Sequence, residues 1–177
     1  MSAENHRRKT SEIVGAIVDL LTALESGGEA VFGRVELFDS ENVVEAFRYL
    51  LVTEQKVAVV VPLDEEFETV ISGLKLIVKR WLPVAILVSD RVLGKRKEAL
   101  WGNDETPGAM GLMELALPAV TGLLLPNPAG VAVEPRSVSI MTIKDTEKEM
   151  PMRVTVCLEV ECRGGWLQAA LGAGQVL

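Results

Sequence analysis

The sequence predicts an α+β fold: a single domain in which a mixed or antiparallel β-sheet is packed by about three helices. Three observations lead to this prediction. Apolar residues at helical spacing occur in some segments, while others are apolar throughout or at every second position. The last two long strands are joined by a short polar turn, which predicts a long C-terminal β-hairpin. The 177 residues suffice for one domain with a substantial core.

The first part of the chain predicts a flexible polar arm over residues 1–9 and then two amphipathic helices. The first helix runs over about residues 10–26, and the following Gly27 helps to end it. The second helix follows Asp39 or Ser40, either of which is a suitable N-cap. In both helices the apolar residues form one stripe, which predicts a single buried face: Ile13, Val14, Ile17, Leu20, Leu21 and Leu24, then Val43, Val44, Phe47, Leu50 and Leu51.

Four stretches in this region predict strands. A short strand is expected around residues 33–37. Residues 56–62 are almost entirely apolar, which is typical of a strand buried on both faces. Residues 65–81 alternate in polarity, with Ser72-Gly73 as a turn or a bulge, and residues 84–88 predict another central strand.

The second half of the chain begins with a polar segment, residues 89–106, which is long for a connecting loop. Thr106-Pro107-Gly108 then predicts the start of a helix, with Thr106 as its cap and Pro107 at the first position. This helix is apolar nearly all round, and Pro118 is expected to kink or end it.

The C-terminal hairpin is predicted from two strands, residues 130–143 and 152–163. Near Pro135 the alternation of apolar and polar residues shifts by one position, which predicts a bulge or an edge strand. The second strand alternates clearly, with one apolar and one polar face. We therefore place one domain at residues 10–163 and an apolar, glycine-rich tail at residues 164–177.

Composition excludes several classes of protein. The net charge of -7 provides no overall basic surface for nucleic acid. Cys157 and Cys162 are five positions apart on one strand, so they point to opposite faces and do not pair. His6 is the only histidine and lies in a polar terminus, which argues against a zinc site. No signal peptide or membrane helix is predicted, and a cytosolic protein with reduced thiols is expected.

Catalytic motifs are not found either. Gly94-Lys95 lacks the upstream glycine and the following Ser or Thr of a phosphate-binding loop. A histidine base for a serine or cysteine nucleophile is missing apart from His6. Carboxylate or magnesium chemistry remains an alternative, because acidic residues cluster in two places: Asp64, Glu65, Glu66 and Glu68, and Glu159 with Glu161. We predict no catalytic, cofactor-binding or metal-binding residues, since such clusters are usually solvated.

Two segments are candidate interfaces. The polar segment 89–106 combines cations with an aromatic residue, and it allows a solvated loop, phosphate contacts or docking on an acidic neighbour. The apolar tail allows either a frayed terminus or an ordered contact. We predict that the polar segment docks on a partner, and that Trp166 anchors the tail against the sheet or a neighbouring subunit. The candidate interface residues are Arg91, Lys95, Arg96, Lys97, Trp101, Trp166, Leu167 and Leu171.

The order of the elements resembles a known family. The segments concerned are KVAVVVPL, GLKLIVKRW, VAILVSD, DRVLGKRKEALWG, TPGAMGLMELALPAV, VEPRSVSIM and MRVTVCLEVECRGGW, which follow an amphipathic N-terminal helix. Over about residues 10–166 this order is similar to the tail terminator, or tail completion, proteins of tailed bacteriophages. It also resembles the small neck proteins of Mu-like prophages.

The resemblance implies a structural virion protein without catalytic residues. It implies a ring of identical subunits, six in this family, that caps the tail tube, stops its growth and joins the head or neck. The partners would be the tail tube protein and a head–tail connector, with DNA passing through the lumen and no membrane contact. The protein would be assembled in the host cytoplasm and reside in the virion. Other interpretations are another connector or a tail tube subunit, or a cytosolic carboxylate- or metal-dependent enzyme.

High apolar content supports an oligomer independently. Hydrophobic residues make up 49% of the chain, and the mean hydropathy is +0.28. Two strands that are apolar on both faces need cover on both faces, and about three helices are too few to be sure of it. A neighbouring subunit is therefore expected to complete the cover.

Overall fold

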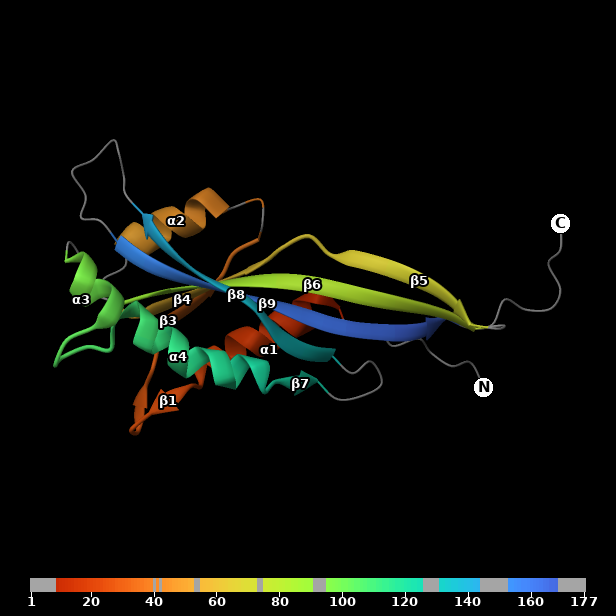
Figure 1. Ribbon diagram of the computed structural model, residues 1–177, viewed down its shortest axis with the longest axis horizontal. Helices are drawn as coiled ribbons and strands as arrows, with labels where there is room; N and C mark the ends of the chain where they lie inside the picture. Colours follow the sequence, from red (N-terminus) through yellow and green to blue (C-terminus); the bar gives the residue numbers. More distant parts are fainter. Residues whose placement is uncertain are drawn as a thin grey trace.

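The computed structural model describes residues 9–39, 41, 43–52, 55–72, 75–90, 95–125, 131–143 and 153–168 (Figure 1). It confirms the predicted α+β fold. The elements are α1 (Thr10–Thr22), β1 (Glu25–Ser26), β2 (Glu29–Ala30), β3 (Arg34–Leu37), α2 (Val43–Val52), β4 (Val57–Pro62), β5 (Glu66–Ser72), β6 (Lys75–Ser89), α3 (Arg96–Trp101), α4 (Gly108–Thr121), β7 (Leu124–Leu125), β8 (Val131–Ile143) and β9 (Arg153–Gln168).

One mixed seven-stranded sheet organises the molecule. Its order is β3-β4-β6-β9-β8-β7, and β5 pairs with β6 beside this path. β3 is parallel to β4, whereas all other neighbours in the sheet are antiparallel. The small β1–β2 hairpin stands apart from it, with Gly27 and Gly28 at positive φ in its turn.

The strand β6 differs from the prediction, which divided its residues between two strands. It runs unbroken from Lys75 to Ser89 and has two different neighbours along one edge. Residues 75–81 pair with β5, and residues 84–89 pair with β4. Along its other edge, β6 pairs with β9 over almost its whole length.

The main core lies between one face of the sheet and the helices α1 and α4 (Figure 1). The predicted stripe of α1 is confirmed, because Ile13, Val14, Ile17 and Leu21 are all buried. Every second residue of the central strands meets them, from Val84, Ile86 and Val88 on β6 to four apolar residues on β9: Val154, Val156, Leu158 and Val160.

The opposite face of the sheet holds a second, smaller core under α2. Ala46 and Leu50 of α2 pack on the odd-numbered positions of β4, Val57, Val59 and Val61. The strand β4 is thus buried on both faces, as predicted. The expectation that its cover requires a neighbouring subunit is wrong, because α2 supplies it from the same chain.

Two local predictions in the middle of the chain are also wrong. The segment 89–106 contains the short helix α3 and is not one loop. Thr106 does not cap α4: the N-cap position is Pro107, and the Thr106 hydroxyl bonds to Asp90 instead. Pro118 is tolerated inside α4, which ends at Thr121 soon after it.

The C-terminal hairpin of β8 and β9 is confirmed, and so is the irregularity at Pro135, where the register shifts between Pro135 and Ser137. Both cysteines are free and lie on opposite faces of the sheet: Cys162 belongs to the main core and Cys157 packs against the smaller one. The predicted tail boundary at residue 164 is wrong, because β9 continues to Gln168.

Candidate assembly interface

The predicted cationic contact lies on and just before α3. Lys95, Arg96 and Lys97 are exposed, and the Lys95 ammonium is 3.4 Å from a Glu98 carboxylate oxygen. Trp101, at the end of the same helix, is 61% exposed, an unusual fraction for so large an aromatic side chain. Arg91, the fifth member of the predicted group, lies outside the described residues. The four described members are therefore all accessible on or beside this one short helix.

The position of α3 is fixed by close backbone contacts behind it. Gly102 and Gly108 both have positive φ, and a Cβ on either would lie 2.3 Å from backbone atoms of the facing segment. The buried Asp90 carboxylate accepts hydrogen bonds from the Thr106 hydroxyl and from the Gly108 backbone N–H, the latter at 2.7 Å. These bonds tie the start of α4 to the end of β6, so α3 projects from a rigid base.

Arg153, at the first position of β9, is fully buried beside this base. Its guanidinium donates to the Ser89 hydroxyl and to the Asp90 backbone carbonyl, each at 2.7 Å, and to the Gln55 carbonyl at 2.8 Å. Removal from water lowers the pKa of Arg153 to about 10. Sequence analysis missed this residue because Arg153 borders a charged turn, where an arginine is ordinarily solvated.

Trp166 and Leu167, predicted to lie in a tail, belong to β9. Their backbones pair with Val78 and Ile77 of β6, whereas Leu171 lies outside the described residues. This end of β9 belongs to a three-stranded extension that we call the arm: β5, residues 75–81 of β6 and residues 163–168 of β9. In Figure 1 the arm extends to the right, past the helices.

The arm carries exposed apolar side chains. Phe67 is 48% exposed and Ile71 is 75% exposed, and Val78 beside them is only partly buried. Phe67 and Ile71 are four positions apart on β5, and Val78 pairs with Thr69 between them, so all three lie on one face of the arm. It is the face that α1 and α4 cover elsewhere in the sheet.

A buried ion pair marks the boundary where the arm leaves the rest of the molecule. The Arg80 guanidinium donates to both carboxylate oxygens of Glu65, at 2.9 and 2.6 Å, and to the Thr10 hydroxyl at 2.7 Å. The Thr10 hydroxyl also bonds to Glu65. The N-terminus of α1 is thereby attached to β6 at the root of the arm, and bidentate geometry of this kind is favourable.

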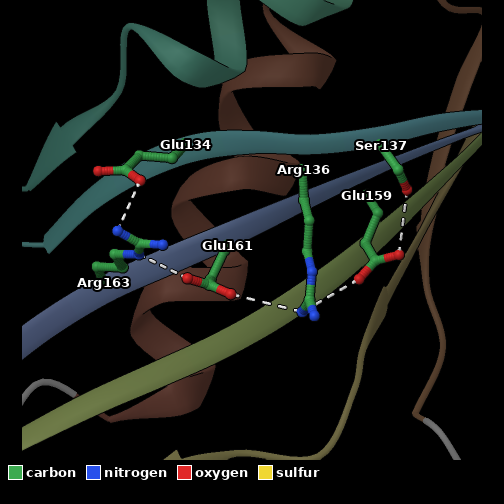
Figure 2. A network of polar contacts seen from close by, with 6 residues as sticks. All are labelled: Glu134, Arg136, Ser137, Glu159, Glu161 and Arg163. Atoms are coloured by element: carbon green, nitrogen blue, oxygen red, sulfur yellow. Dashed lines mark hydrogen bonds and ion pairs between the residues drawn. The ribbon is translucent and has the colours of Figure 1, made fainter.

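The acidic residues of β9 that sequence analysis weighed for catalysis are paired with arginines (Figure 2). Arg136 is 3.4 Å from both Glu159 and Glu161. Arg163 contacts Glu161 at 2.5 Å and Glu134 at 3.1 Å, and these contacts raise the pKa of Arg163. Ser137 donates to Glu159 at 3.3 Å. These contacts thus form a network of three carboxylates and two guanidinium groups on the exposed face of β8 and β9.

The other acidic cluster is dispersed. Glu65 faces Arg80, Glu68 lies 3.3 Å from Lys79, and Asp64 and Glu66 are exposed. Within the described ranges, no three His, Cys, Asp or Glu residues lie close enough together to hold a metal ion.

Neither a protein-family model nor a curated protein sequence matches this chain. Among the described helices, none is both long enough and apolar enough to cross a bilayer. The features that bear on function are therefore those of the molecule itself: the surface of α3, the arm and the sheet edges.

Proposed function

We propose that this protein is a structural assembly subunit, similar to phage tail terminators, which forms a homo-oligomeric ring at the end of a tail tube. The proposal combines the resemblance in element order with the nature of the exposed surface. The ring would be hexameric, as in the family that the sequence resembles. It would stop tube growth and present a joining surface to the head or neck.

The observation that carries the proposal is the apolar face of the arm. Phe67 is 48% exposed and Ile71 is 75% exposed, and the arm that carries them extends past the helices in Figure 1. Burying each of two such side chains contributes about 1.5–3 kcal/mol. Contact with another protein chain would recover this free energy, and a subunit made for assembly has that contact permanently available.

The α3 surface supports a second contact, made with a different protein. Its three cations and Trp101 are presented on a base that close glycine contacts and the Asp90 hydrogen bonds hold in place. An exposed aromatic residue that shares a short helix with cations suits an acidic partner surface. In the proposed assembly that partner is the tail tube protein or the head–tail connector.

The experiment is a mass measurement with imaging. Light scattering on the purified full chain over a range of concentrations should give a multiple of the subunit mass, and negative-stain images should show rings with an open lumen. A monomer at every concentration, with no ring on added tail tubes, would contradict the proposal. Particles of another closed form would favour a different connector.

A further inference from the structure

The edges of the central sheet are not protected equally. β3, at one margin, is only four residues long and carries an Arg34–Glu36 ion pair of 2.8 Å. At the opposite margin, β7 covers the first two residues of β8. In the part of the chain that the structure describes, no strand pairs with the outer edge of β5, and none pairs with the outer edge of β8 beyond Ala132.

The open part of β8 is unusual in composition. After the register shift at Pro135, residues 137–143 read Ser-Val-Ser-Ile-Met-Thr-Ile and include no charge, proline or glycine. Val138 is 44% exposed and Ile140 is 46% exposed. Natural proteins ordinarily protect such an edge with charges or prolines, because an uncharged edge of high β-propensity pairs with other chains. This segment is therefore suited to pairing with a further strand.

β5 has the complementary properties. It also spans seven residues, and Phe67, Thr69 and Ile71 occupy one of its faces. Through β6 and β9, this face is continuous with the face on which Val138 and Ile140 lie, since Val138 pairs with Leu158 of the main core. Its other face carries Glu66 and Glu68, which would meet no acidic residue on the open part of β8.

We propose that β5 of one copy pairs with residues 137–143 of β8 in the next copy, so that the sheet continues between subunits. This inference rests on the proposed ring and specifies its contact. β5 and β8 run in opposite directions within one subunit, because three antiparallel steps separate them. When a neighbouring copy has its helices on the same side of the continued sheet, its β5 therefore lies antiparallel to β8 of the first copy.

Full overlap of the two segments gives a definite register. It places Ile71 beside Val138 and Thr69 beside Ile140, so that the apolar rows adjoin on one face. Glu66 and Glu68 fall beside Ile143 and Met141, away from other carboxylates. Pairing of β5 with a second β5 would instead bring four glutamates together on one face. The complementary edges lie at opposite margins of each copy, so they make a head-to-tail contact, which is the kind of contact that builds a ring.

Cross-linking between differently labelled copies tests this contact. Full-length Ile71→Cys protein is mixed with full-length Val138→Cys protein and treated with a short bis-maleimide. A mixed dimer is expected from the pair, and little product from either variant alone. The wild type controls for Cys157 and Cys162, and Val44→Cys on the exposed side of α2 serves as the matched control.

A second variant tests the same edge of β8 without chemical cross-linking. Val138→Lys with Ile140→Lys adds charges at two exposed positions, so the subunit fold should persist. Oligomer dissociation should then begin at a concentration about tenfold or more higher than for the wild type. Val44→Lys should leave the oligomer unchanged.

The outcomes separate this inference from the proposed ring. A full-size oligomer that gives no mixed cross-link, and that is unaffected by the two lysines, overturns the strand contact and leaves the ring. Self-linking of Ile71→Cys or of Val138→Cys alone shows a two-fold contact, which also overturns the proposed pairing of β5 with β8. A monomer at every concentration overturns both.

Discussion

The same two strands, β6 and β9, run through two very different environments. In the body of the molecule, α1 and α4 cover one face and α2 covers part of the other, and Val84, Ile86 and Val88 under α1 and α4 are completely buried. In the arm the strands continue with β5 beside them, and Phe67 and Ile71 face outward. The ion pair of Arg80 with Glu65 stands at the transition.

This contrast shows that the apolar pattern of a strand depends on the layers that cover it. Where helices cover both faces, a strand must be apolar at nearly every position. Where one face is exposed, apolar residues are needed only at every second position. The arm pairs its backbone fully but buries little side-chain surface. We therefore expect changes in the body to alter folding and changes in the arm to alter assembly.

The largest effect is expected at the far end of the body. Arg153→Met removes the donors to Ser89, Asp90 and Gln55 and leaves buried oxygens unpaired. Loss of one partner from such a buried polar network costs about 3–5 kcal/mol. Urea unfolding followed by circular dichroism measures it. An equally stable Arg153→Met variant would show that the network is dispensable.

The most direct comparison uses two isoleucines on the same face of the sheet. Ile86→Ala in the body should lower the free energy of unfolding by about 2–5 kcal/mol, because it leaves a cavity. Ile71→Ala in the arm should change it by less than about 0.5 kcal/mol, because the side chain is exposed. Both are measured on dissociated subunits by denaturant unfolding. Equal losses would mean that Ile71 is buried in the subunit as deeply as Ile86.

The exclusion of water from the core of the body can be tested through Cys162. Burial, partly offset by Arg80, raises the pKa of this thiol from 9.0 to about 12. The unfolded chain then releases a proton between pH 9 and 12 that the folded chain keeps, so stability is full below pH 9 and falls above it. At pH 10 the loss should be about 1.4 kcal/mol relative to pH 8. Cys162→Ala should lack this component of the pH dependence.

A smaller effect of opposite sign is expected at Thr155. This side chain is fully buried on β9, and its hydroxyl has no hydrogen-bond partner among the described residues. Thr155→Val keeps the shape and removes the unsatisfied group, so it should raise the free energy of unfolding by about 1 kcal/mol. Thr142→Val, at an exposed position, is the control. A destabilised Thr155→Val would indicate a water or partner bonded to the hydroxyl.

The smallest effect on stability is expected at α3. Reversing the charges of Lys95, Arg96 and Lys97 to glutamate changes only exposed side chains, so stability should shift by less than about 0.5 kcal/mol. Ring formation should persist, whereas attachment to the tube or neck should weaken. Sedimentation with purified tails measures this attachment. Normal attachment would remove α3 from the docking surface.

The sequence alone determined the elements whose pattern depends on local periodicity. The stripe of α1, the doubly apolar β4, the hairpin of β8 and β9 and the irregularity at Pro135 follow from the order of apolar residues along each segment. The separation of Cys157 and Cys162 follows from the two-residue period of a strand. Exposure of the cations and Trp101 on α3 was also consistent with their polar surroundings.

Features that depend on residues distant in the chain follow from tertiary contacts and not from local sequence. Residues 164–168 are a strand because β6 offers an unpaired edge there, although their glycines disfavour order when considered alone. Arg153 and Arg80 are buried because carbonyls and a carboxylate from other segments compensate them. The two open edges exist because no remaining described strand covers β5 or most of β8. Local periodicity specifies which side of a strand is apolar, but pairing and layer contacts determine what covers it.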